Sequence, residues 1–121
     1  MKTALLLIAH GSRKDEANAD LLHVVTALRR LRGDECVEPA YLELAHPDID
    51  EGANRCVAEG AECVILLPYF LSAGVHVTRD LSEARRRLTK RHPGVVFRLA
   101  KALGRHPLLL DILVERAREA L

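Results

Sequence analysis

Tryptophan is absent from this chain of 121 residues, and aromatic residues make up only 3% of it. The net charge is +1, so the chain lacks the basic excess that is typical of nucleic-acid-binding proteins. No apolar run approaches the ~18 residues of a membrane span. The start, Met1-Lys2-Thr3 and then six apolar residues, is too short for a secretory signal. We therefore expect a cytoplasmic protein with no nucleic-acid or membrane partner.

Cysteine is also scarce. The three cysteines, Cys36, Cys56 and Cys63, are an odd number and show no C-x-x-C spacing. This pattern favours small buried residues that stay reduced over a disulfide or a structural metal site.

What the chain does contain is an alternation of short apolar runs and amphipathic stretches, which predicts one domain over residues 1–121. The runs Ala4–Ala9 and Cys63–Leu67 predict two central strands. Pro39 within Cys36–Leu44 and Arg98 within Val95–Ala100 predict two edge strands. Helices are expected over Arg13–Arg32 with Gly33 as its cap, from Asp48 to about Gly60, from about Thr78 to Arg91, and from Pro107 onward.

A βαβαβαβα pattern calls for a parallel sheet covered by helices on both faces, which is an α/β three-layer sandwich. The strand order 2-1-3-4 places the two most apolar strands in the middle. The last helix is expected to pack through an apolar stripe that consists of Leu109, Ile112, Leu113, Ala117 and Ala120.

Two histidines follow the two central strands. His10 ends the first apolar run, His76 follows the third strand, and each has an arginine three residues later, Arg13 and Arg79. In the 2-1-3-4 order the chain reverses direction between these strands, and ligands bind at the carboxyl ends of strands at such a switch point. The sequence therefore predicts that His10 and His76 converge on one crevice.

Two neutral imidazoles suit a borderline divalent cation such as Co²⁺, Fe²⁺, Ni²⁺ or Zn²⁺. Two protein ligands make an open, exchangeable metal site rather than a closed structural one. Glu43, at the end of the second strand, is either a third participant, as proton acceptor or ligand, or an exposed edge-strand residue. His46 precedes Pro47 and is either structural or a border of the site.

Small residues and arginines surround the two histidines. Gly11, Ser12 and Arg13 offer backbone N–H groups and a positive charge at a helix entrance, where anions bind. A second small-residue loop, which permits close approach by a bulky ligand, and a further positive charge come from Ser72, Ala73, Gly74 and Arg79. A metal-handling crevice ringed by carboxylate-binding groups is the resulting hypothesis.

Three segments carry a family resemblance: Leu7-Ile8-Ala9-His10-Gly11-Ser12-Arg13, Leu42-Glu43-Leu44-Ala45-His46-Pro47, and Pro68-Tyr69-Phe70-Leu71-Ser72-Ala73-Gly74-Val75-His76-Val77-Thr78-Arg79-Asp80. Together they resemble the small, single-domain sirohydrochlorin cobaltochelatases of the class II chelatases. The resemblance implies ATP-independent insertion of Co²⁺ into sirohydrochlorin in anaerobic cobalamin (vitamin B12) biosynthesis, with no cofactor beyond the metal substrate.

The same resemblance implies that His10 and His76 bind the metal, and that the small forms work as homodimers with the tetrapyrrole between two lobes. Family members with these motifs insert Fe²⁺ for siroheme, or Ni²⁺, so the metal stays open. On the residues themselves we hypothesise that both histidines hold the cation and help to accept pyrrole protons, with Glu43 assisting.

Other readings of the motifs remain. His10-Gly11 is similar to the R-H-G motif of histidine phosphatases and mutases, but Ala9 stands where that family has a phosphate-binding arginine. A receiver-type signalling domain would need acidic residues after the first strand. A non-catalytic carrier of metal or tetrapyrrole would use the same binding groups as a chelatase.

Overall fold

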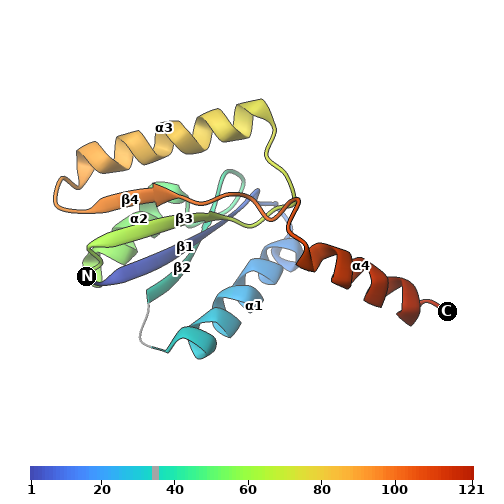
Figure 1. Cartoon of the computed structure of the whole chain (residues 1–121). Coiled ribbons are helices and arrows are strands. Elements are labelled where there is room, and N and C mark those ends of the chain that lie inside the picture. The colour runs from blue at the N-terminus through green and yellow to red at the C-terminus, as the bar shows by residue number, and fades with distance from the viewer. Residues whose placement is uncertain (34–35) are drawn as a thin grey trace.

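Residues 1–33 and 36–121, which the computed structural model describes, form four strands and four helices in strict alternation. The strands are β1 (Thr3–Ala9), β2 (Cys36–Tyr41), β3 (Cys63–Pro68) and β4 (Val96–Leu99), and the helices are α1 (Asp15–Arg32), α2 (Ile49–Ala58), α3 (Val75–Arg91) and α4 (Leu108–Glu119). The strands pair in parallel in the order β2-β1-β3-β4 (Figure 1). This order confirms the sequence-based prediction.

The central strand β1 is buried on both faces, which explains its unbroken apolar run. Ala4, Leu6 and Ile8 belong to the core cluster that α2 and α3 cover. Leu5 and Leu7 belong to the cluster on the opposite face, under α1. The sheet therefore separates two cores, and its carboxyl end carries the loops that follow β1, β2 and β3.

Edge strand β2 differs from its prediction in length and in burial. It ends at Tyr41 rather than Leu44, and Leu44 has a positive φ of 65°. All six strand residues are buried, although the sequence looked half polar. Glu38 is accommodated because Arg29 of α1 reaches over it, with a guanidinium–carboxylate distance of 3.4 Å.

Local hydrogen bonds decide where the helices begin. α1 starts at Asp15 instead of Arg13, because the Asn18 side chain brackets the backbone N–H and C=O of Ser12 and keeps it outside the helix. α3 starts at Val75, three residues earlier than predicted, with Gly74 as an extended N-cap. The predicted cap of α2 is confirmed, since the Glu51 N–H donates to Asp48 Oδ1 at 2.8 Å.

The fourth helix forms where it was predicted, but the prediction that its apolar stripe covers the sheet is wrong within one chain. None of the residues of α4, all of them described, is buried. The helix projects away from the domain (Figure 1). Among the helices in the described ranges, none combines the length and the apolar character that crossing a membrane requires.

Candidate active site

The loops that follow β1 and β2 run side by side at the carboxyl end of the sheet. The Leu42 N–H donates to the Ala9 carbonyl at 2.9 Å, and the Glu43 N–H donates to the His10 carbonyl at 3.1 Å. Gly11, with φ at 95°, lies so close to this pair that a Cβ there would stand 1.8 Å from the Glu43 carbonyl oxygen. The backbone thus fixes His10 next to Glu43.

His10 and Glu43 line a cavity of about 350 Å³ between α3 and the start of α2. The other lining residues are Leu42, Ile49, Val77, Asp80, Glu83, Ala84 and Arg87. Acidic side chains therefore outnumber basic ones around it, and Arg87 is already paired with Asp50 at 2.9 Å. Such a lining attracts a cation.

His76 lies in the first turn of α3, next to Val77 of the lining. Residues spaced by four and seven positions share one side of a helix, so His76 lies on the same side as Asp80 and Glu83. His76 therefore lies on the helix that forms one wall of the cavity but is not among the residues that line it, whereas His10 and Glu43 are.

Each imidazole has a neighbour of its own. The His10 ring packs on Phe70, with ring centroids 4.6 Å apart and planes tilted by 31°. His76 Nδ1 lies 3.0 Å from Arg79 Nη2. Within the described ranges, no ring contact or hydrogen bond joins His10 to His76. Their joint hold on one metal ion stays a prediction.

The prediction of an anion-binding loop after β1 is partly wrong. Ser12 does not offer its backbone N–H, because that group donates to Asn18 Oδ1 at 2.9 Å, and Ser12 Oγ accepts from the Lys14 N–H. Arg13 is exposed in a separate groove that also contains His46. His46 itself contacts Glu51, with Nδ1 2.8 Å from the carboxylate. Arg13 and His46 therefore lie outside the cavity's lining.

The loop after β3 remains a candidate for ligand and anion binding, as the sequence predicted. Ser72 and Gly74 are exposed, Ala73 is half-buried, and α3 begins directly after them. The first turn of α3 has no side-chain cap and no acidic residue, so its backbone N–H groups are available to an anion. Arg79, also exposed, extends the positive charge on this side.

Sequence reasoning missed Asp80, Glu83 and Phe70. The signal for the first two was present: with Val77, Ala84 and Arg87 they recur at helical spacing along one side of α3. Phe70 gave no such signal, because only the folded chain shows that the second residue after β3 packs on the first residue after β1.

Comparison with a protein-family model shows to which family this chain belongs. The CbiX family model matches residues 4–120, which is nearly the whole chain. The chain belongs to the CbiX family. Among curated relatives, the sirohydrochlorin cobaltochelatase of Priestia megaterium is 38% identical over 98% of this chain and 39% of its own length. The chloroplastic sirohydrochlorin ferrochelatase of Arabidopsis thaliana is 34% identical over 97% of this chain and 52% of its own length.

The CbiX chain thus spans about half the length, or less, of those relatives, whereas it covers 91% of the Sulfolobus acidocaldarius sirohydrochlorin cobaltochelatase at 30% identity. Solved structures agree on the fold. The CbiX protein of Marinobacter aquaeolei VT8 superposes with a TM-score of 0.84 at 31% identity, covering 99% of this chain and 95% of that one. The sirohydrochlorin chelatase SirB of Bacillus subtilis subspecies spizizenii, in complex with cobalt, gives 0.89 at 26% identity, covering 98% and 51%.

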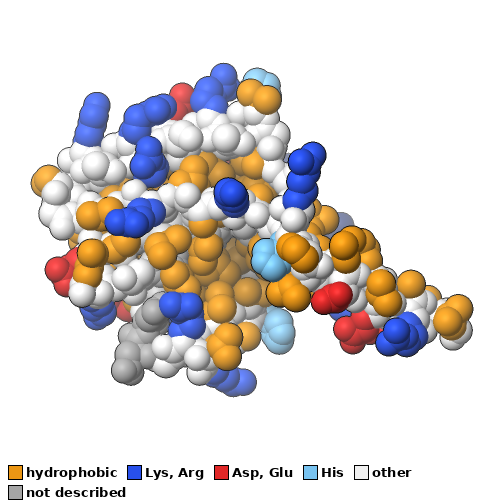
Figure 2. Space-filling model, viewed as in Figure 1, with side chains coloured by type: hydrophobic (Ala, Val, Ile, Leu, Met, Phe, Trp, Pro, Cys, Tyr) orange, Lys and Arg blue, Asp and Glu red, His pale blue; other side chains and the backbone are white. Residues whose placement is uncertain are grey.

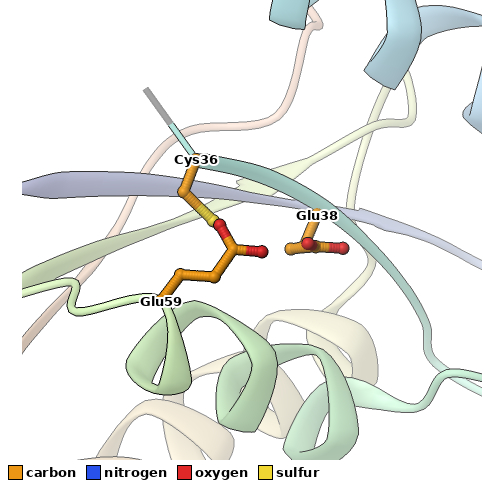
Figure 3. A group of neighbouring side chains, drawn as sticks. All are labelled: Cys36, Glu38 and Glu59. Carbon is orange, nitrogen blue, oxygen red and sulfur yellow. The ribbon is translucent and has the colours of Figure 1, made fainter. Parts of the chain in front are cut away.

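A second polar cluster of this CbiX chain lies at the opposite end of the sheet. Cys36, Glu38 and Glu59 place a sulfur and two carboxylates within 4.8 Å of one another (Figure 3). Burial raises the pKa of Glu38, and burial together with the nearby Glu59 raises the pKa of the Cys36 thiol far above its usual range. The hydrogen bond from Cys36 lowers the pKa of Glu59. Protons are therefore shared among Cys36, Glu38 and Glu59 themselves, and Arg29 lies beside Glu38. We assign this cluster a structural role.

This cluster gives a pH-dependent prediction for Glu38→Gln. Because the native pKa of Glu38 is raised, its contribution to stability is complete below the unfolded value near 4.5 and is lost as the pH rises through the native value. The Gln variant does not titrate there. We expect the difference between the Tm of the variant and the Tm of wild type to change by a few degrees in favour of the variant between about pH 4.5 and pH 8.

Thermal unfolding of both proteins across that range measures the difference. Glu16→Gln, at an exposed position in α1, is the matched control and should show no such trend. A wild-type advantage that grows with pH would contradict the assignment.

Proposed function

We propose that this chain is a sirohydrochlorin chelatase that inserts Co²⁺ without ATP, in anaerobic cobalamin biosynthesis. One observation carries the proposal: in a CbiX-family chain, His10 and Glu43 share an acidic cavity, and the helix α3 that forms another wall of it has His76 in its first turn. Relatives that match nearly all of this chain are named sirohydrochlorin cobaltochelatases and ferrochelatases. Metal and tetrapyrrole are both substrates here.

The metal enters through the acidic wall. Glu43, Asp80 and Glu83 raise the local concentration of a divalent cation, and His10 supplies an imidazole nitrogen, a good ligand for Co²⁺. Phe70 packs on one side of the His10 ring and limits its rotation. Glu43, exposed and fixed beside His10, is positioned to accept a proton that leaves a pyrrole nitrogen as the metal binds.

Arg79 controls when His76 is available. A guanidinium only donates, so its contact with Nδ1 at 3.0 Å requires Nδ1 to accept, which leaves the proton of the neutral ring on Nε2. Neither nitrogen is then free for a metal. A carboxylate of sirohydrochlorin that draws Arg79 away would free Nδ1. We therefore expect the macrocycle to bind before the metal is transferred.

The polycarboxylate macrocycle needs anchors outside the acidic cavity. The uncapped first turn of α3, behind Ser72, Ala73 and Gly74, supplies N–H groups, and Arg79 supplies a planar guanidinium suited to carboxylates. Arg13, in its neighbouring groove, can hold a carboxylate farther out on the ring. The cavity then takes the cation and the loops take the acid groups.

Insertion rates for Co²⁺, Fe²⁺ and Ni²⁺ on the one purified protein test this function. Imidazole and carboxylate groups accept all three metals, so the choice of cobalt rests on the 38% identical relative. We expect the absorbance spectrum of sirohydrochlorin to convert to the metallated form fastest with Co²⁺. A faster reaction with Fe²⁺ would change the assignment to a ferrochelatase. Binding of sirohydrochlorin with no acceleration over the protein-free rate would make the chain a carrier.

A further inference from the structure

The connection between β4 and α4 lies directly beside the loop that leads from β3 to α3 (Figure 1). The Leu103 N–H donates to the Phe70 carbonyl at 3.1 Å, and Gly104 packs so closely on the Leu71 carbonyl oxygen that a Cβ would stand 2.1 Å from it. Only glycine permits this approach. Arg105 follows at once in the chain, so its backbone is fixed next to the loop after β3.

These contacts make the connection the fourth loop at the site end of the sheet. The loop after β3 packs Phe70 on the ring of His10, with centroids 4.6 Å apart, and the loops after β1 and β2 are joined through His10 and Glu43. All four strands are parallel, so the loops that follow them share one end of the sheet. The connection therefore borders the site, although neither β4 nor α4 lines the cavity around His10.

Arg105 has a backbone conformation that favours glycine. Its φ is 60°, and in the described part of the chain Leu44, with φ at 65°, is the only other non-glycine residue with a positive φ. Both lie in loops at the carboxyl end of the sheet. At the amino end, where α1 and α2 lead into β2 and β3, the positive-φ positions are glycines, Gly33 and Gly60. Strained residues of this kind concentrate at functional sites, so an arginine at position 105 requires a reason other than the fold.

The guanidinium of Arg105 is available to a ligand. Arg105 is exposed, and its side chain has no hydrogen-bond or ion-pair partner among the residues that the structure describes. Neighbouring groups are engaged by contrast. His106 Nδ1 accepts from the Leu108 N–H at 3.2 Å, and Arg79 contacts His76. Arg105 therefore supplies a positive charge at this end of the sheet that no other group neutralises.

The surroundings of the connection suit an anion. Figure 2, in the same view as Figure 1, shows many basic side chains on this side of the domain, whereas acidic ones are few outside α4. The cavity around His10 is lined instead by Glu43, Asp80 and Glu83, and its volume is about 350 Å³. The rim of a polycarboxylate macrocycle centred at His10 extends beyond so small a cavity. Cation and carboxylates are thus attracted to different places at one end of the sheet.

We propose that Arg105 binds a carboxylate of the tetrapyrrole, as an anchor at the rim of the macrocycle. The planar guanidinium can donate two parallel hydrogen bonds to one carboxylate. The close packing of Gly104 on Leu71 fixes the base of the side chain, so the anchor has a defined position relative to the loop that contains Phe70. Because the ligand is taken to be the tetrapyrrole, this role rests on the proposed function. Arg105 has no part in metal binding.

Titration of the protein with sirohydrochlorin in the absence of metal, followed by absorbance, tests the anchor in Arg105→Asn. Asparagine tolerates a positive φ better than arginine does, so the Tm of the variant should equal or exceed that of wild type. Binding should nevertheless weaken about 10-fold, as expected for the loss of a hydrogen bond between charged groups at an exposed position. A merely structural role would not give opposite changes in stability and binding. Unchanged binding overturns the proposal, and so does a Tm that falls together with binding.

Arg86→Gln is the matched control, because it removes the same charge from an exposed position on α3. It should bind sirohydrochlorin as wild type does. An equal loss in both variants would show a general effect of net charge and would overturn the proposal. With Co²⁺ present, Arg105→Asn should raise the KM for sirohydrochlorin about 10-fold and leave kcat within about twofold, since the contact is the same before and during insertion. A lowered kcat with an unchanged KM contradicts a binding anchor.

Failure of this anchor and failure of the proposed function give different results. Wild type that inserts Co²⁺ while Arg105→Asn binds and inserts equally well contradicts the anchor alone. Wild type that binds sirohydrochlorin but inserts no metal contradicts the proposed function alone, and the titration of Arg105→Asn still decides on the anchor. Wild type that does not bind sirohydrochlorin overturns both.

Discussion

Replacing His10 and His76 together with alanine is expected to lower the rate of Co²⁺ insertion at least about 100-fold, to near the protein-free rate. His10 lies in the wall of the acidic cavity and His76 in the first turn of α3, which forms another part of that wall, so the double variant removes both proposed nitrogen ligands. Both residues are exposed, and the free energy of unfolding should change little. Absorbance of sirohydrochlorin with Co²⁺ measures the rate.

The control for this pair is His23→Ala, an exposed histidine in the middle of α1 that does not line the cavity. It should insert Co²⁺ at the wild-type rate. The single variants separate the two roles: loss of His10 also removes the packing on Phe70, whereas loss of His76 frees Arg79. Near-normal insertion by the double variant would rule out both imidazoles as the metal-handling groups.

Gly11→Ala is expected to lower the free energy of unfolding by on the order of 2–5 kcal/mol. The new Cβ would stand 1.8 Å from the Glu43 carbonyl oxygen, and φ at 95° is strained for any residue with a side chain. Relief of the overlap requires the loops after β1 and β2 to separate. Insertion activity should therefore fall as well, because His10 and Glu43 move apart. Chemical denaturation and the insertion assay measure the two effects.

Two other glycines separate the causes. Gly33→Ala introduces a positive-φ strain, φ at 68°, but no contact within 4 Å, and Gly94→Ala introduces neither. We expect a graded series in which Gly94→Ala is near wild type, Gly33→Ala loses about 1 kcal/mol, and Gly11→Ala loses most. Only Gly11→Ala should affect insertion. Equal losses at Gly11 and Gly33 would show that the close approach to Glu43 is unimportant.

The sequence determined the order and the type of every element. Apolar runs such as Leu5–Ile8 can be satisfied only by burial on both faces of a sheet, and this requirement placed β1 and β3 in the centre. Local signals also sufficed for Gly33 and for the Asp48 cap, because both depend on neighbours within a few residues. His10, Glu43 and His76 were placed near the same end of the sheet by strand order alone.

Tertiary structure decided what the side chains do there. The Asn18 side chain accepts a hydrogen bond from the Ser12 N–H, and Arg79 contacts Nδ1 of His76. Phe70 packs against the His10 ring. These partners are chosen by packing between elements, and periodicity carries no information on them. The same holds for α4. Its apolar pattern predicted that it packs on the sheet, but the contacts of Leu103 and Gly104 hold the connecting segment where the helix projects from the domain, and only the folded backbone determines these contacts.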